Sequence, residues 1–238
     1  MKRFKPLNIL DNKGFWPEKA AIADAIKEVQ ALGGGRVPWP VRDYGRYRSP
    51  QWRDEKNNLV PWQSVDWYVF DSLDEERMQV DAVRVLQNLL SEPWRDERLI
   101  GEHYDLMVLQ EDMYDSSLTG AAGPAPYVVG RARAMAAAVV STHRIENIWG
   151  MPFSYVKTEV MRQLCFMFGI PSRSREDVAV IDGSVYCRNV CILRPAVQAP
   201  DDWTTLTVDR LRRGALCEPC RQDLKEFFAG AEREAASP

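Results

Sequence analysis

Residues 154–170 read SYVKTEVMRQLCFMFGI, and this stretch decides the fold. Its apolar residues recur every three or four positions, which predicts a helix over 154–168 with one buried side. The residues on that side are Val156, Val160, Leu164, Met167 and Phe168. Arg162 lies in the same core helix, where burial of a guanidinium is costly unless an anion accompanies it.

The sequence on both sides of this helix alternates between strand-like and helix-like patterns. Apolar runs predict strands over 4–10, 65–70, 104–110, 126–129 and 136–142, and helical spacing predicts helices over 17–32 and 74–90. In the helix over 74–90, Met78 and Leu90 are among the side chains expected to face inward. Helices that alternate with strands indicate an α/β (α+β) domain with a mixed, mostly parallel sheet.

Two histidines, His103 and His143, are the whole supply in 238 residues. A catalytic zinc centre with three histidine ligands is therefore excluded within one chain. The remaining composition, with 45% hydrophobic and 27% charged residues, is that of a globular protein. The longest apolar run, 134–140, is far too short to span a bilayer, so we expect a cytoplasmic protein without a membrane partner.

A segment over 36–64 is rich in proline, arginine, tryptophan and tyrosine, and has little periodicity. It is read either as an ordered excursion packed on the domain or as a partner-binding surface. Its interleaved arginines and aromatic residues could also stack on bases. The formal net charge of −3 argues against a nucleic-acid partner.

Four of the five cysteines form two close pairs, Cys187 with Cys191 and Cys217 with Cys220. Thiolates at these spacings can converge tetrahedrally on Zn²⁺, and a site with four cysteines leaves no position for a catalytic water. The pattern thus favours one structural zinc that staples the C-terminal part, and the alternative is a set of unrelated buried thiols. The fifth cysteine, Cys165, is most simply a small core residue.

The helix over 154–168 resembles the active-site helix of the archaemetzincins, a metzincin family of zinc peptidases with the pattern H-E-x-x-H-x-x-G-x-x-H. Other stretches resemble the same family in the same order, and the similarity covers roughly residues 65–228. These stretches are 77–82, 104–106, 118–130, 138–145, 187–193 and 216–220. The segment 138–145 is similar to the family's edge strand and the turn that follows it.

The resemblance locates the positions where the family holds its catalytic zinc. With Gly169 on the motif glycine, Arg162 stands in place of the first histidine and Gln163 in place of the catalytic glutamate. Phe166 replaces the second histidine, and Tyr186 is the best counterpart of the third ligand. Every essential residue is therefore substituted, whereas the cysteine pairs resemble those that bind the family's second zinc.

The resemblance implies a metzincin-like fold in two parts. Residues 1–170 would form an archaemetzincin-like N-terminal subdomain that includes the excursion 36–64. Residues 171–230 would form a small C-terminal subdomain stapled by the zinc site. The tail over 231–238 is polar and is expected to be frayed.

Two functions are open on these grounds. The first is a pseudopeptidase that has lost the catalytic zinc, keeps the structural one and binds or scaffolds a protein or peptide partner, because an edge strand can pair with an extended peptide. The alternative is an enzyme with a repurposed cleft that hydrolyses or modifies peptides through Cys165, Glu159 or Tyr186, with His143 as a possible base for the thiol.

A third expectation concerns the vacated zinc position. We expect Arg162 to pair there with a carboxylate from the loop that follows the helix, with Gln163 and Tyr186 hydrogen-bonded nearby. The acids that this loop offers are Glu176, Asp177 and Asp182. The alternative is that Arg162 points to solvent.

Overall fold

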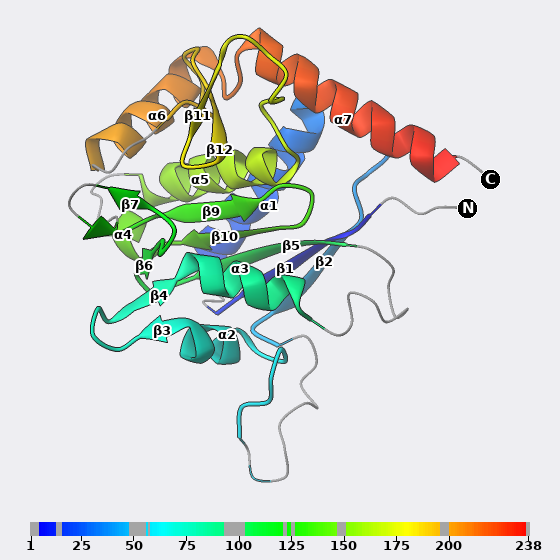
Figure 1. Cartoon of the computed structure of the whole chain (residues 1–238). Coiled ribbons are helices and arrows are strands. Elements are labelled where there is room, and N and C mark those ends of the chain that lie inside the picture. Colours follow the sequence, from blue (N-terminus) through cyan, green and yellow to red (C-terminus); the bar gives the residue numbers. More distant parts are fainter. Residues whose placement is uncertain are drawn as a thin grey trace.

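The computed structural model describes residues 5–12, 16–47, 56, 58–92, 103–120, 123–124, 127–146, 151–195 and 200–236. Its centre is a five-stranded sheet in the order β2-β1-β5-β10-β9 (Figure 1). The first four strands are parallel to one another, and β9 is antiparallel to its neighbour β10. The strands are β1 (Leu7–Asp11), β2 (Val41–Gly45), β5 (Tyr104–Leu109), β9 (Gly130–Arg133) and β10 (Ala137–Ser141). The predicted mixed, mostly parallel sheet is confirmed.

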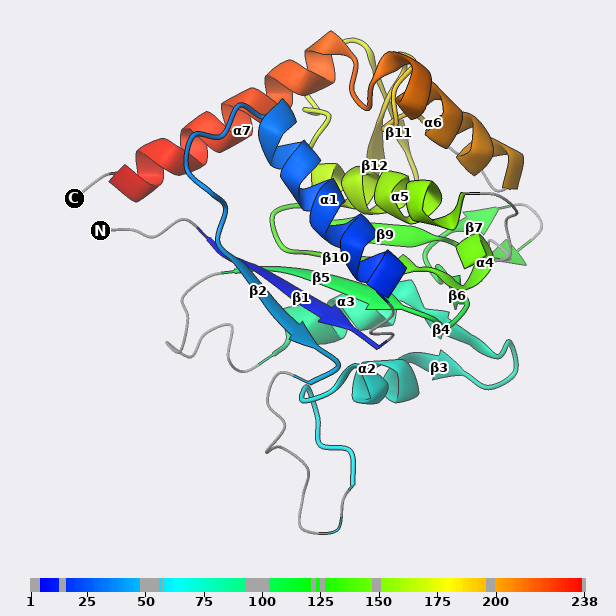
Figure 2. The same cartoon turned by 180° about the vertical axis from the view of Figure 1, so that it is seen from behind.

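Helices cover both faces of this sheet. The long helices α1 (Trp16–Leu32) and α5 (Pro152–Met167) lie on one face, and the shorter α2 (Val65–Ser72) and α3 (Ala82–Leu90) lie on the other (Figures 1 and 2). Strand β5 supplies both cores, because Leu106 and Val108 face the first layer while Met107 and Leu109 face the second. A central parallel strand buried on both faces explains why its sequence is continuously apolar rather than alternating.

Smaller elements surround one end of the sheet. They are β3 (Leu73–Asp74), β4 (Gln79–Asp81), β6 (Met113–Tyr114), β7 (Thr119–Gly120), β8 (Gly123–Pro124) and α4 (His143–Glu146). The first three form a small sheet in the order β3-β4-β6, and β7 pairs with β8. No helix in the described ranges is long and apolar enough to cross a membrane.

The C-terminal part is a hairpin followed by two helices, β11 (Val178–Ile181), β12 (Ser184–Cys187), α6 (Pro200–Arg213) and α7 (Glu218–Ala236). Its apolar residues join the same core cluster as α1 and α5. Phe228 of α7 packs on Gly33 at the end of α1, where an added Cβ would lie 2.3 Å from the phenyl ring. Residues 231–236 of the tail belong to α7, which extends to Ala236.

The segment 65–70, predicted as a strand, is a helix. Ser64 caps α2 through its hydroxyl oxygen, which accepts a hydrogen bond from the Trp67 amide at 3.3 Å. The buried residues Val65, Tyr68 and Ser72 then follow helical spacing. A short apolar run without alternation fits either element, so the cap is the signal that separates the two.

The helix predicted over 74–90 begins only at Ala82. The Asp74 carboxylate accepts hydrogen bonds from the Glu76 and Arg77 amides, each at 3.1 Å, and so stabilises a turn. Met78 then adopts a φ of +53° and is 73% exposed, so its predicted inward orientation was wrong. Asp81 caps α3 by accepting from the Val83 amide at 3.0 Å.

The edge of the main sheet is also different from the prediction. The segment 138–145 was assigned to the edge strand, but β10 pairs with β5 on one side and with β9 on the other. The strand at this edge is β9, just after the predicted strand 126–129, and β2 forms the opposite edge of the sheet. In that segment Val128 forms one isolated bridge to Met113, and residues 125–126 lie outside the described ranges.

Gly169 ends α5 with a φ of +76°, a left-handed conformation that costs a residue with a Cβ about 1–2 kcal/mol. Gly169→Ala is therefore expected to lower the free energy of unfolding by that amount, measured by chemical denaturation. Gly230→Ala is the matched control, because Gly230 lies inside α7 and alanine there should be neutral or stabilising. Equal effects of the two substitutions would contradict the backbone explanation.

Candidate metal centre and cleft

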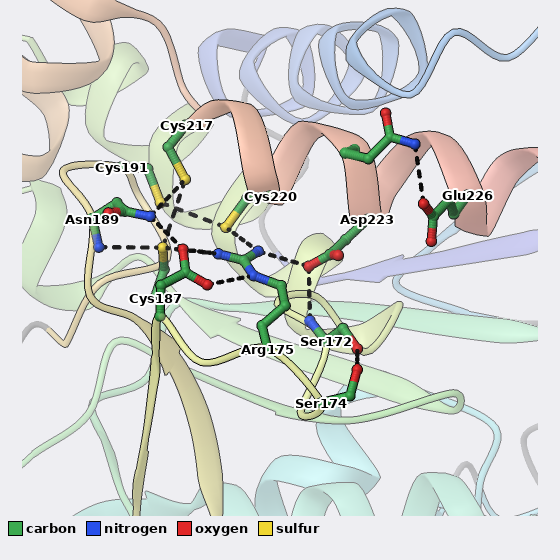
Figure 3. A network of polar contacts seen from close by, with 12 residues as sticks. Ser172, Ser174, Arg175, Cys187, Asn189, Cys191, Cys217, Cys220, Asp223 and Glu226 are labelled. Atoms are coloured by element: carbon green, nitrogen blue, oxygen red, sulfur yellow. Dashed lines mark hydrogen bonds and ion pairs between the residues drawn. The ribbon is translucent and has the colours of Figure 1, made fainter.

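The two cysteine pairs converge at the junction of the C-terminal elements (Figure 3). Cys187 ends β12, Cys191 follows in the next loop, Cys217 precedes α7 and Cys220 lies in its first turn. The four sulfur atoms all lie within 4.8 Å of one another, with 3.6 Å between Cys187 and Cys217. Sulfurs bound tetrahedrally to zinc are about 3.8 Å apart, so the cluster could hold a metal of this kind.

The cysteines are free thiols, and their surroundings favour ionisation of at least one. Hydrogen bonds from the Cys191 and Cys220 thiols lower the pKa of Cys187. The same coupling raises the pKa of Cys191 to about 12. Because the thiolate is the form that binds metal, a cluster that already favours one thiolate is suited to a cation.

The side chain of an arginine, Arg175, contacts the cysteine cluster (Figure 3). The guanidinium of Arg175 donates to the sulfur atoms of Cys220 at 3.3 Å and Cys187 at 3.7 Å. Asp177 and Asp223 hold it in place, with contacts of 2.5 Å and 2.7 Å. The hydrogen bond to Asp177 raises the pKa of Arg175, so a fixed positive charge faces the sulfurs. Four thiolates around one Zn²⁺ carry two net negative charges, which this cation partly neutralises.

Arg175→Gln is expected to weaken zinc binding by about 10–100-fold, because it removes the cation and two hydrogen bonds to ligand sulfurs. Competition with a chromophoric chelator measures the change. Arg173→Gln is the matched control, since Arg173 is exposed and makes no contact with a cysteine among the described residues. An affinity unchanged in the Arg175 variant would show that the network does not support metal binding.

A cavity of about 580 Å³ lies on the sheet face covered by α5. One wall is the segment 127–134, which includes β9, and the opposite wall is the hairpin segment 182–186. Helix α5 contributes Glu159, Arg162 and Gln163 between them. Arg131 of β9 spans the walls, with an ion pair to Asp115 at 3.1 Å and a hydrogen bond to the Ser184 hydroxyl at 2.9 Å.

The three residues predicted at the former zinc-ligand positions meet in this cavity. Arg162 is 5% exposed, and its guanidinium carbon lies 5.0 Å from the ring centre of Phe166 and 5.8 Å from that of Tyr186. The two rings meet edge to face at 5.5 Å. A guanidinium against aromatic faces gains cation–π attraction, so the three side chains form one cluster.

The prediction that Arg162 pairs with a carboxylate of the following loop was wrong. Its Nη1 donates to the backbone carbonyls of Ile192 and Arg194, the latter at 2.8 Å, and no carboxylate of the described residues pairs with it. Asp177 is instead engaged by Arg175, while Glu176 and Asp182 are exposed. The alternative of a solvent-facing Arg162 was wrong as well, since the side chain is buried.

Glu159 and Gln163 form the part of the cavity next to β9. The Gln163 amide donates to the Glu159 carboxylate at 2.7 Å, and both side chains are buried. Gly130 allows α5 to approach β9 this closely, because a Cβ there would lie 2.6 Å from Glu159 Oε1. Gln163 is therefore hydrogen-bonded to Glu159, and both residues line the same cavity as Arg162.

Two residues proposed for a repurposed cleft lie elsewhere. Cys165 is fully buried in the main core, and this burial raises the pKa of its thiol. His143 is exposed at the start of α4. Neither residue lines the cavity, whereas Glu159 and Tyr186 do. A buried, protonated thiol without a nearby base is a core residue rather than a nucleophile.

A second cluster of ionisable side chains lies at the start of β5 and was missed in the sequence. Glu92, His103 and Asp105 are at least 97% buried, and their ligand-type atoms lie within 4.8 Å of one another. His103 contacts Asp105 at 3.2 Å, and Asn8 donates to the same carboxylate at 3.2 Å. The available signal was Asp105 itself, a charged residue inside a continuously apolar strand.

The fold is a mixed α/β architecture with a mostly parallel sheet, an antiparallel edge strand and a long helix beside the cavity. The particular likeness is to the crystal structure of archaemetzincin from Methanopyrus kandleri, with a TM-score of 0.59 and 20% sequence identity. The match covers 94% of this chain and 96% of that one, so the chain has an archaemetzincin-like fold. No protein-family model and no curated protein matches the sequence.

Proposed function

We propose that this chain is an archaemetzincin-like pseudopeptidase. It holds one structural zinc on Cys187, Cys191, Cys217 and Cys220, and it binds an extended peptide segment of a cytoplasmic partner protein in the cleft between β9 and the β11–β12 hairpin. The observation that carries the proposal is that Arg162, Phe166 and Tyr186, which the family resemblance aligns with the ligands of the catalytic zinc, form one cluster in the cavity.

The side chains around this cluster do not fit a catalytic zinc. Zinc in peptidases of this type needs neutral imidazole nitrogens and a free carboxylate to activate water. Both histidines of the chain lie among the described residues, and neither lines the cavity. The one carboxylate on the helix, Glu159, is bonded to Gln163, and a guanidinium stands beside it in place of a ligand.

The cysteine cluster fits a structural zinc better than a catalytic one. Four sulfurs at these separations fill a tetrahedral coordination shell, which leaves no open position for water or substrate. Three of the four cysteines are buried within the core that α7 closes. The metal would therefore contribute to folding rather than to chemistry.

A peptide-binding role follows from the position of β9. This strand pairs with β10 on one side, and its other edge borders the cavity without a further strand among the described residues. An exposed edge presents unpaired amide and carbonyl groups, to which an extended peptide can add as a further strand. The cavity beside it gives room for the peptide's side chains.

The test combines a cleavage assay with a binding assay on the zinc-loaded chain. A broad set of quenched fluorogenic peptides with added zinc is expected to remain uncleaved, and extended peptides are expected to bind. Cleavage that is lost when zinc beyond one equivalent per chain is removed, with the cysteine-bound zinc retained, would contradict the loss of the catalytic metal. Cleavage that persists after this removal and disappears in Glu159→Gln would instead favour the alternative, a repurposed enzyme, for which the buried Glu159 carboxylate in the cavity is the one favourable observation.

A further inference from the structure

Arg162 is a buried cation that has no counterion among the described residues. Its side chain is 5% exposed, and the described residues offer it two backbone carbonyls and two aromatic faces but no carboxylate. Carbonyl groups and rings offset part of the desolvation of a guanidinium, yet a buried charge is ordinarily paired. The chain thus leaves a positive charge at the centre of its cleft.

Half of the guanidinium remains available to a ligand. Both carbonyl contacts use Nη1, whereas Nε and Nη2 form no hydrogen bond with the described residues. Neither of these two nitrogens is fully shielded from solvent, and Arg162 lines the cavity. Adjacent N–H groups on Nε and Nη2 form the edge that binds both oxygens of a carboxylate at once.

The acidic residues that line the cavity do not accept hydrogen bonds from Nε or Nη2 of Arg162. Asp115 pairs with Arg131, and Glu159 accepts from Gln163. Asp182 is exposed at the turn of the β11–β12 hairpin and forms no ion pair within the described part of the chain. Two exposed arginines on the cavity walls, Arg133 and Arg173, add to the positive potential that an incoming anion meets.

We infer that Arg162 binds a carboxylate of the peptide ligand, either an aspartate or glutamate side chain or the peptide's own C-terminus. This inference rests on the proposed peptide-binding function and specifies the chemistry that the cleft selects. A carboxylate is favoured over a phosphate because the buried Glu159 lies one helical turn away and would repel a dianion more strongly than a monoanion.

The experiment uses a solution library of random nonapeptides, captured on the immobilised zinc-loaded chain and identified by mass spectrometry. One half of the library has free C-termini and the other half is amidated. Enrichment of aspartate or glutamate at one position in the amidated half assigns the side chain, and enrichment confined to the free half assigns the terminus. For a selected peptide, replacing that carboxylate by an amide should weaken binding by about tenfold or more.

Substitutions at Arg162 test whether this residue causes the carboxylate preference. Arg162→Gln is expected to remove the carboxylate preference and Arg162→Lys to keep part of it, while Arg212→Gln, at an exposed arginine outside the cavity lining, should leave it unchanged. If Arg162→Gln fails to fold, the ¹⁵Nε–Hε resonance of Arg162 in the unaltered chain should shift with the carboxylate peptide and not with its amide. Peptides captured without any carboxylate preference would overturn the inference and leave peptide binding intact. Capture of no peptide at all would overturn both.

Discussion

Cys191→Ser is expected to release the metal and to lower the free energy of unfolding by more than about 4 kcal/mol, because loss of a structural metal is among the few causes of so large a drop. Cys191 is 2% exposed and its sulfur lies 4.0 Å from that of Cys220, so serine removes a ligand and leaves the remaining thiolates without a shared cation. For a chain of this size, that change corresponds to a fall in melting temperature of about 10 °C or more.

The control for this substitution is Cys165→Ala. Cys165 is equally buried but lies outside the four-cysteine cluster, so its loss should leave the metal in place and cost only the packing of one sulfur. Metal content and thermal denaturation are measured for both variants. A Cys191 variant that keeps its metal, or that unfolds at the temperature of the unaltered chain, would show that the cluster is a set of buried thiols.

Phe228→Ala is expected to cost about 3–5 kcal/mol, the range for removal of a fully buried phenyl ring. Phe228 is 1% exposed and meets Trp39 and Phe168 edge to face, with centroid distances of 6.1 Å and 5.9 Å. It is the residue of α7 that rests on Gly33, so the substitution opens a cavity where the C-terminal helix joins the sheet domain.

Chemical denaturation measures this loss, and Glu226→Ala is the matched control on the exposed side of α7. The control should change stability by no more than about 0.5 kcal/mol. A Phe228 variant as stable as that control would mean that α7 does not depend on this contact. The expected drop in the free energy of unfolding would indicate that α7, with the cysteine cluster, unfolds cooperatively with α1.

The sequence predicted the structure best where a fixed spacing of residues corresponds to one structure. The helical spacing of 154–168 predicted α5 to within two residues at its start and one at its end. The cysteine spacings correctly predicted four convergent sulfurs. The positions of Arg162, Phe166 and Tyr186 around one point were predicted through the family resemblance, because a motif fixes which helix face points to the cleft.

The errors arose where local patterns fit more than one structure. The apolar run 65–70 fits a strand or a helix, and only the cap at Ser64 decides between them. The edge position of β9 depends on pairing between distant segments, which periodicity does not report. The partner of Arg162 was missed because carbonyl acceptors come from the backbone of residues 192–194 and carry no side-chain signature.

The proposed function requires that the chain holds one zinc, at the cysteines, and none in the cleft. The most direct measurement is the zinc content per chain of protein purified with zinc present, determined by elemental mass spectrometry. The account predicts one zinc per chain, lost in Cys191→Ser and retained in Glu159→Gln and in His143→Ala. Two zinc ions per chain, with one lost in the Glu159 or His143 variant, would contradict it.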